Sequence, residues 1–417
     1  MVAAGSISLG ISKRSEARMQ KTVPRMPAAI WALGFVSMLM DISSELIHSL
    51  LPVFMVTVLG ASAFTIGLIE GGAEATALIA KVFSGALSDY LGKRKMLAVI
   101  GYGLGALTKP LFAIATGVGM VVTARFLDRV GKGIRGAPRD ALVADIALAS
   151  IRGAAFGLRQ SLDTVGAFVG PLLAIGLMLL WANDFRAVFW VAVIPGFLSV
   201  ALLLIAVREP TRPTERQPGE KRVNPIHWRA IKRFSRAYWW VVAVGGVFTL
   251  ARFSEAFMLL RAQQLGLPLA WVPLVLVVMN LVYALSAYPF GRLSDRVSHH
   301  KLLAAGLVVL IAADAVLAAS PTAAMVFAGA ALWGLHMGMT QGLLATMVAD
   351  TAPADLRGTA FGFFNLLSGV AMLVASALAG FLWDRLGAPF TFGAGAVFCV
   401  IGIAGIVVRS QKLVARA

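Results

Sequence analysis

The chain has 417 residues, of which 59% are apolar and only 14% are charged. Soluble proteins average about 45–50% apolar and about 25% charged residues. With a mean hydropathy of +0.83, this composition excludes a soluble globular enzyme. It predicts a polytopic helical membrane protein, because helices satisfy their own backbone hydrogen bonds in lipid. The single cysteine, Cys399, excludes a disulfide framework and thiolate metal sites.

Twelve apolar stretches approach or exceed the roughly 20 residues that a helix needs to cross a bilayer. They lie near residues 29–57, 63–90, 96–116, 118–140, 153–180, 186–206, 238–262, 268–291, 301–319, 322–350, 357–382 and 388–408. We expect an all-α membrane protein whose twelve transmembrane helices form two pseudo-symmetric six-helix bundles, at 29–206 and 238–408. Residues 1–28, 207–237 and 409–417 are expected to form an N-terminal tail, a linker and a C-terminal tail.

The formal net charge is +17, and the basic residues are distributed unequally between the two sides on which the loops alternate. Cations such as Lys93, Arg152 and Arg296 fall on one side together with the linker, whereas the other side has few, chiefly Arg186 and Arg385. The positive-inside rule therefore places both termini and the linker in the cytoplasm, for a bacterial-type inner membrane. Membrane topology accounts for the basic residues, so no nucleic-acid partner is expected.

The two halves of the chain repeat each other. Arg-Gly-Ala-Ala-Phe-Gly at 152–157 recurs as Arg-Gly-Thr-Ala-Phe-Gly at 357–362, and Val-Ala-Asp at 143–145 recurs at 348–350. Gly-Ala-Leu-Ser-Asp at 85–89 recurs as Gly-Arg-Leu-Ser-Asp at 291–295. The spacing of about 205 residues indicates a duplicated half-chain. Many secondary transporters are built in this way, with the substrate site between the halves near the membrane midplane.

Residues 85–95 resemble the loop signature between helices 2 and 3 of the major facilitator superfamily: a glycine, an acid, then Gly-Arg-Arg/Lys. The resemblance implies a transporter that works by alternating access, normally as a monomer, with no enzymatic activity, resident metal or cofactor. Its partners would be a small-molecule or ion substrate, protons and the lipid bilayer. A gate on the cytoplasmic side is expected from Gly85, Asp89, Gly92, Lys93 and Arg94.

Two further patterns bear on coupling and direction. Arg129-Val-Gly-Lys132-Gly is similar to the superfamily's Arg-x-x-Gln-Gly pattern, in which the arginine is linked to proton coupling; Lys132 departs from that pattern, so the role carries over to Arg129 alone. Gly166, Gly170 and Pro171 resemble the Gly-x-x-x-Gly-Pro signature of drug/proton antiporters, although its double glycine is incomplete. The resemblance favours export and adds these three residues to the gating set.

Ionisable groups deep in a bilayer are costly and are functional candidates by default. Asp41, Glu45 and His48 share one face of the first helix, since they are spaced i, i+4, i+7. We expect helices 1 and 4 to face each other through such groups. Glu70 and Glu74 are weaker candidates, and Lys109 is expected to snorkel. The predicted proton-coupling residues are Asp41, Glu45, Asp128, Arg129 and Asp163; the alternative is a static ion-pair network that fixes helix register.

The C-terminal half offers hydrogen-bonding groups more than charge. Arg252 and Glu255 are one turn apart and are expected to pair. The predicted substrate-cavity residues from both halves are His48, Arg125, Lys132, Arg159, Arg252, Glu255, Asn280, His336, Gln341 and Asn365.

Two functions remain open. The first is a secondary active transporter that exports a small solute, driven by the proton gradient. The alternative is a transition-metal or metal-chelate transporter that uses Asp41, Glu45, His48 and His336, since imidazole suits Zn, Cu, Fe and Ni. An enzyme is not expected, because the sequence has no Gly-x-Ser-x-Gly, His-Glu-x-x-His or P-loop motif.

Overall fold

The computed structural model describes residues 26–91, 93–148, 151–209, 233–294, 296–353 and 356–414. The helices of the first half are α2 (Ala28–His48), α3 (Leu51–Thr57), α4 (Ala63–Leu91), α5 (Arg94–Ala113), α6 (Val118–Ile146), α7 (Arg152–Leu180) and α8 (Phe185–Ala206). Those of the second half are α9 (Arg236–Ala251), α10 (Ala256–Gln264), the short η3 (Leu269–Trp271), α11 (Leu274–Ser294), α12 (His299–Ala319), α13 (Ala323–Thr351), α14 (Arg357–Leu386) and α15 (Ala388–Val414).

These helices supply twelve membrane crossings, with α2–α3 and α9–α10 each forming one interrupted crossing. Within the described residues, 11 of the crossings are long and apolar enough to span a bilayer by themselves. The exception is α6, which carries eight charged residues. It packs against α4 and α5, so much of its charge faces protein. The prediction of an all-α, twelve-helix membrane fold is confirmed.

The first helix of each half is interrupted, which the sequence did not predict. In the first half, α2 ends at His48, and α3 begins at Leu51 with Pro52 in its first turn. A proline fits there because its missing N–H needs no partner at a helix start. In the second half, residues 252–255 separate α9 from α10, and the Ser254 N–H donates to Oγ of Ser376 on α14 at 3.2 Å. We call residues 252–255 the helix 7 break.

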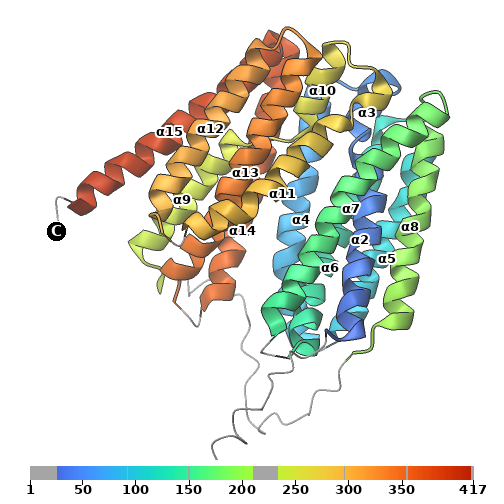
Figure 1. Ribbon diagram of the computed structural model, residues 1–417, viewed down its shortest axis with the longest axis horizontal. Helices are drawn as coiled ribbons and strands as arrows, with labels where there is room; N and C mark the ends of the chain where they lie inside the picture. Colours follow the sequence, from blue (N-terminus) through green and yellow to red (C-terminus); the bar gives the residue numbers. More distant parts are fainter. Residues whose placement is uncertain are drawn as a thin grey trace, which may run out of the picture.

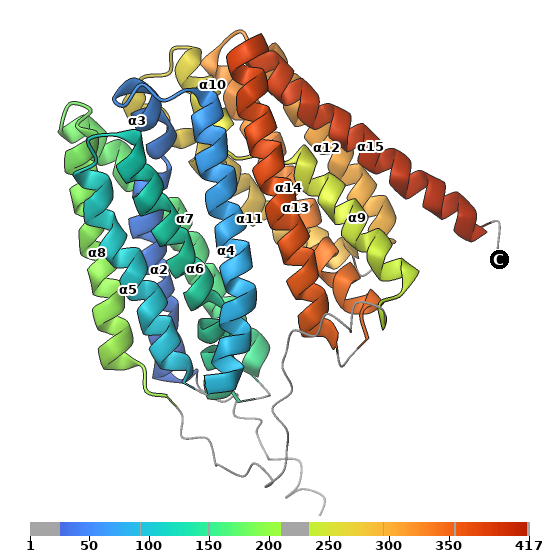
Figure 2. The ribbon, with the colours of Figure 1, turned by 180° about the vertical axis from the view of Figure 1, so that it is seen from behind.

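The two halves lie side by side and diverge toward one end (Figures 1 and 2). We call this the linker end, because α8 ends there and α9 begins there. At the opposite end the halves are in contact. Small residues make that contact close: a Cβ at Gly71 of α4 would lie 2.8 Å from Cβ of Ser376, and a Cβ at Gly380 of α14 would lie 2.7 Å from Cα of Phe64. Small residues allow helix backbones to approach in this way.

A carboxylate also joins the halves at the end opposite the linker. Asp384 of α14 accepts hydrogen bonds from the backbone N–H groups of Ala63 at 3.1 Å and Phe64 at 2.9 Å. These groups open α4, where the first N–H groups lack intrahelical partners and the helix dipole favours negative charge. The second half thus supplies the N-terminal cap of a helix in the first half.

The first prediction concerns this cap between the halves. Replacing Asp384 by Ala removes a cap worth about 1 kcal/mol and is expected to shift the protein toward the state in which this end opens. Spin labels on cysteines at the exposed positions Thr116 and Thr322, both at that end, would report a longer mean distance.

Asp184→Ala is the matched control. Asp184 caps α8 through the N–H groups of Arg186 and Ala187, at 3.0 and 3.1 Å, entirely within the first half. Its loss should lower thermal stability without changing the label distance. Equal distance distributions in wild type and D384A would show that the Asp384 cap does not hold the halves together.

Candidate functional site

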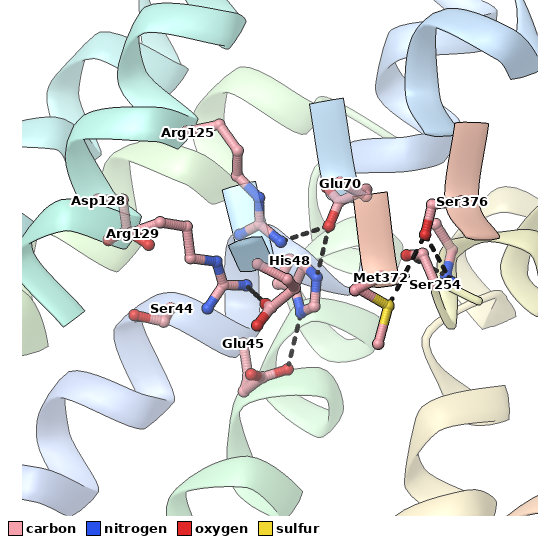
Figure 3. A network of polar contacts seen from close by, with 12 residues as sticks. Ser44, Glu45, His48, Glu70, Arg125, Asp128, Arg129, Ser254, Met372 and Ser376 are labelled. Carbon is pink, nitrogen blue, oxygen red and sulfur yellow. Dashed lines mark hydrogen bonds and ion pairs between the residues drawn. The ribbon is translucent and has the colours of Figure 1, made fainter. Parts of the chain in front are cut away.

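A line of polar contacts runs from α2 through α4 to α6 in the first half (Figure 3). The imidazole of His48, the last residue of α2, lies 3.5 Å from Oε2 of Glu45 through Nδ1 and 3.3 Å from Oε2 of Glu70 through Nε2. A guanidinium N–H of Arg125 donates to the same Glu70 oxygen at 2.5 Å. We call Glu45, His48, Glu70 and Arg125 the His48 network.

A second ion pair lies parallel to the Glu70–Arg125 pair, one helical turn away along α4 and α6. Arg129 contacts Glu74 at 3.0 Å, so the i, i+4 acids of α4 match the i, i+4 arginines of α6. The two pairs differ in access to solvent, because the Glu70 side chain is 1% exposed and that of Glu74 is 35% exposed. Arg125 and Arg129 therefore pair with acids of helix 2 and not with acids of helix 1, as had been expected. Glu70 and Glu74, which the sequence suggested only as weaker candidates, supply the carboxylates of both ion pairs.

Asp128 belongs to a separate buried pair. Nζ of Lys109 on α5 donates to Asp128 at 2.8 Å and to Oγ of Ser44 on α2 at 3.0 Å. The side chains of Lys109 and Asp128 are 2% and 5% exposed. Snorkelling of Lys109 is therefore not observed, since its ammonium group finds a carboxylate inside the bundle. The pair fixes α5 against α6.

Asp163 lies in a third cluster, between α6 and α7. Its carboxylate accepts a hydrogen bond from Arg159 and lies 3.8 Å from Arg139. Asp140 contacts the same two arginines, at 3.6 Å for Arg159 and 3.1 Å for Arg139. The predicted coupling residues are thus divided among several groups, and Asp163 is not joined to Glu45 by any contact described in the structure.

The glycines of the antiporter-like signature support the acidic face of α2. A Cβ at Gly166 would lie 2.9 Å from Cβ of Asp41, and one at Gly170 would lie 2.8 Å from Cβ of Glu45. Pro171 is buried beside them. Asp41 is half-buried and forms no ion pair among the described residues. Any larger residue at either glycine would push Asp41 and Glu45 away from α7.

The gating residues are only partly described. A Cβ at Gly85 would meet Cβ of Ala137 on α6 at 3.4 Å, an ordinary van der Waals distance, so the packing of α4 on α6 does not require glycine there. Arg94 donates to Asp145 at 2.6 Å, and its backbone N–H donates to Glu209 at 2.5 Å. Lys93 is exposed just before α5. Gly92 and the side chain of Asp89 lie outside the described residues.

The expected cavity residues of the second half are not brought into one contact group. Arg252 and Glu255 lie in the helix 7 break and, among the described residues, form no ion pair with each other. Asn280 on α11 and Asn365 on α14 are half-buried. The side chain of Gln341 lies outside the described residues. In the first half, Lys132 of α6 is exposed to solvent.

His336 does not line a cavity as expected. It is fully buried, its Nδ1 lies 2.8 Å from the carbonyl oxygen of Gly306 on α12, and its ring stacks on Phe248 at 5.1 Å. The residue is a packing contact within the second half, because a histidine near the middle of a span can face a neighbouring helix as readily as a cavity. Periodicity alone does not distinguish the two.

The metal-site alternative is not supported. Across the part of the chain that the structure describes, no group of three or more His, Cys, Asp or Glu side chains could hold a metal ion. The His48 network contains the guanidinium of Arg125, which repels a cation, and His336 is packed inside the other half. The expected ligand set is therefore not assembled.

The chain belongs to the Major Facilitator Superfamily, which its sequence matches over residues 33–282 and 256–414. It is a transporter and not an enzyme. It is 31% identical to the MFS-type transporter MJ1317 of Methanocaldococcus jannaschii, over 89% of this chain and 92% of that protein. It is 26% identical to the multidrug resistance protein MdtH of Photorhabdus laumondii, over 84% of this chain and 86% of MdtH.

Solved structures show the same fold. A bacterial homologue of the human lysosomal transporter Spinster, in an inward-facing and unoccupied conformation, superimposes with a TM-score of 0.76 at 16% identity. The match covers 94% of this chain and 99% of that chain. The two proteins therefore share the same fold.

The second prediction compares the two parallel ion pairs. Glu70→Gln leaves the Arg125 guanidinium, whose side chain is 4% exposed, without its carboxylate, and should lower the free energy of unfolding by about 3–5 kcal/mol. Glu74→Gln removes a partner that is 35% exposed and should cost about 1 kcal/mol or less. Denaturant unfolding of the purified protein in detergent measures both. Equal losses of unfolding free energy in the two variants would show that the deeper burial of the Glu70–Arg125 pair does not make it more important for stability.

Proposed function

We propose that this transporter exports a small solute in exchange for protons, by alternating access. The observation that carries the proposal is the line Glu45–His48–Glu70, which leads from a carboxylate whose side chain is 24% exposed to one that is 1% exposed. Imidazole gains and loses protons near neutral pH and can pass them between its two nitrogens. A proton that reaches Glu45 from water therefore has a path to Glu70.

Arg125 connects proton binding to substrate binding in this proposal. Its guanidinium is held by Glu70, and that attraction weakens when Glu70 takes up a proton, because the negative charge is lost. Arg125, Arg129 and Lys132 lie along one stripe of α6. A freed arginine on this stripe attracts an anionic or polar group of the solute. Protonation of Glu70 and binding of such a group to Arg125 then influence each other.

Asp41 is proposed as a second entry point for protons. It lies one turn before Glu45 on α2 and has no ion-pair partner among the described residues. Asp128 and Asp163 are proposed to position α5, α6 and α7 around the network, since each is held by a basic side chain. Arg129 forms an ion pair with Glu74, and this pair is proposed to set the net charge next to Arg125.

Topology and similarity support the proposed direction of transport. With both termini and the linker in the cytoplasm of a bacterial-type cell, the diverging linker end faces inward. A solute then enters from the cytoplasm, and closure through Asp89 and its basic neighbours precedes release outside. The similarity to MdtH and the Gly166–Pro171 signature support export. We propose that the protein acts as a monomer.

The third prediction tests proton coupling. Protein reconstituted in liposomes with an internal pH-sensitive dye is challenged with amphiphilic organic cations, small carboxylates and divalent metal ions. An organic substrate is expected to give a proton signal that Glu45→Gln abolishes, because the variant cannot pass a proton to His48. Asp350→Asn, which neutralises an exposed acid of α13, should behave as wild type.

Three outcomes would contradict this proposal. Substrate flux without any proton movement would remove proton coupling. A proton signal that survives in Glu45→Gln would remove the His48 network as its route. A signal obtained only with metal ions would overturn the assignment to an organic solute.

A further inference from the structure

The second half contains a carboxylate that the His48 network does not use. Asp314 of α12 is fully buried, and neither carboxylate oxygen has a hydrogen-bond partner among the residues that the structure describes. It forms no ion pair within the described residues. A buried ionised carboxylate without a partner is among the most costly groups a protein can hold, so such groups stay neutral or bind a cation.

Asp314 lies where α12, α15 and the end of α9 meet. A Cβ at Gly395 of α15 would lie 2.6 Å from Oδ2 of Asp314, 3.2 Å from the carbonyl oxygen of Ala251 and 3.2 Å from the ring of Phe253. Gly395 thus leaves room for the carboxylate. Ala251 is the last residue of α9, and the last carbonyls of a helix lack intrahelical donors. The acid therefore borders the helix 7 break.

The titratable groups around Asp314 are engaged elsewhere or are neutral. On α13, His336 contacts the carbonyl oxygen of Gly306. On α10, the guanidinium of Arg261 donates to the carbonyl oxygens of Leu317 and Ser320, at 3.3 and 2.9 Å. On α15, Cys399 is also buried.

In the helix 7 break, Arg252 and Glu255 are half-buried. The indole N–H of Trp333 on α13 is another buried group that has no partner in the described part of the chain, and its ring packs against Phe253 at 5.5 Å. These observations describe an apolar site that accommodates a neutral carboxylic acid, and no cation of the described residues is paired with Asp314 there.

We propose that Asp314 is a proton-binding site of the second half, whose protonation holds the helix 7 break closed against α12 and α15. In the described conformation the neutral acid is compatible with its apolar surroundings. When the proton leaves, the anion requires water or a cation, and the irregular backbone of the helix 7 break lies beside it. Deprotonation then favours a conformation in which the break separates from α12.

The inference deepens the proposed proton coupling by adding a carrier in the half opposite to His48. Its first test needs neither substrate nor a pH gradient, so it can succeed or fail independently of the export assignment. Infrared spectra of the purified protein in detergent at neutral pH should contain the C=O stretch of a protonated carboxylic acid that disappears in Asp314→Asn. In Asp314→Glu the band should shift, and in Asp350→Asn it should remain.

Absence of any band that depends on Asp314 would show that the group is ionised and would overturn the proposal. A band that sodium or potassium chloride removes at constant pH would also overturn it, because the site would then bind a metal cation in place of a proton.

The second test measures the consequence for helix 7. Hydrogen exchange of peptides that span residues 248–257 is followed as pH rises, in wild type and in Asp314→Asn, which stays neutral at every pH. Dividing the exchange rate of wild type by that of Asp314→Asn cancels the intrinsic pH dependence of amide exchange. Once Asp314 titrates, this ratio should increase by up to about tenfold per pH unit, because opening then releases one proton. A ratio independent of pH would show that Asp314 does not control the break.

Discussion

The structure depends on one constraint: the charges of α6 must be neutralised inside the protein. A helix with eight charged residues cannot face lipid, because each uncompensated charge in the hydrocarbon region costs several kcal/mol. The first half meets this constraint with two acids on α4 and a lysine on α5. A histidine where α2 ends completes the arrangement around Glu70.

The helix that balances these charges also touches the other half. Glu70 lies between Gly67 and Gly71, and both glycines pack on α14 around Ser376. The hydroxyl oxygen of Ser376 accepts the hydrogen bond from Ser254 in the helix 7 break (Figure 3). A change of charge at Glu70 therefore occurs within one helical turn of the contact between the halves. This proximity gives the charged network a physical connection to the helix 7 break.

The duplicated halves have diverged in chemistry while keeping the same helix order. Both interrupt their first helix, and both place ionisable residues there, His48 in one and Arg252 with Glu255 in the other. The first half surrounds its interruption with ion pairs. The second surrounds its interruption with aromatic rings and the buried acid Asp314, which forms no ion pair among the described residues. The first half can thus respond to a change of charge by forming or breaking ion pairs. The second half can respond through the burial of Asp314.

The sequence by itself determined the fold class, because twelve long apolar stretches with alternating cationic loops permit few other structures. It also identified the glycine signature of α7 and most of the charged candidates. It could not choose partners among those candidates. Periodicity shows which residues share a face of one helix, whereas the rotation and tilt of neighbouring helices decide which faces meet.

Only the tertiary structure therefore paired Glu70 with Arg125, buried His336 against α12 and interrupted the first helix of each half. It also separated Asp163 from the His48 network. The physical reason is the same in each case: these features depend on contacts between segments far apart in the chain, and no local pattern records them.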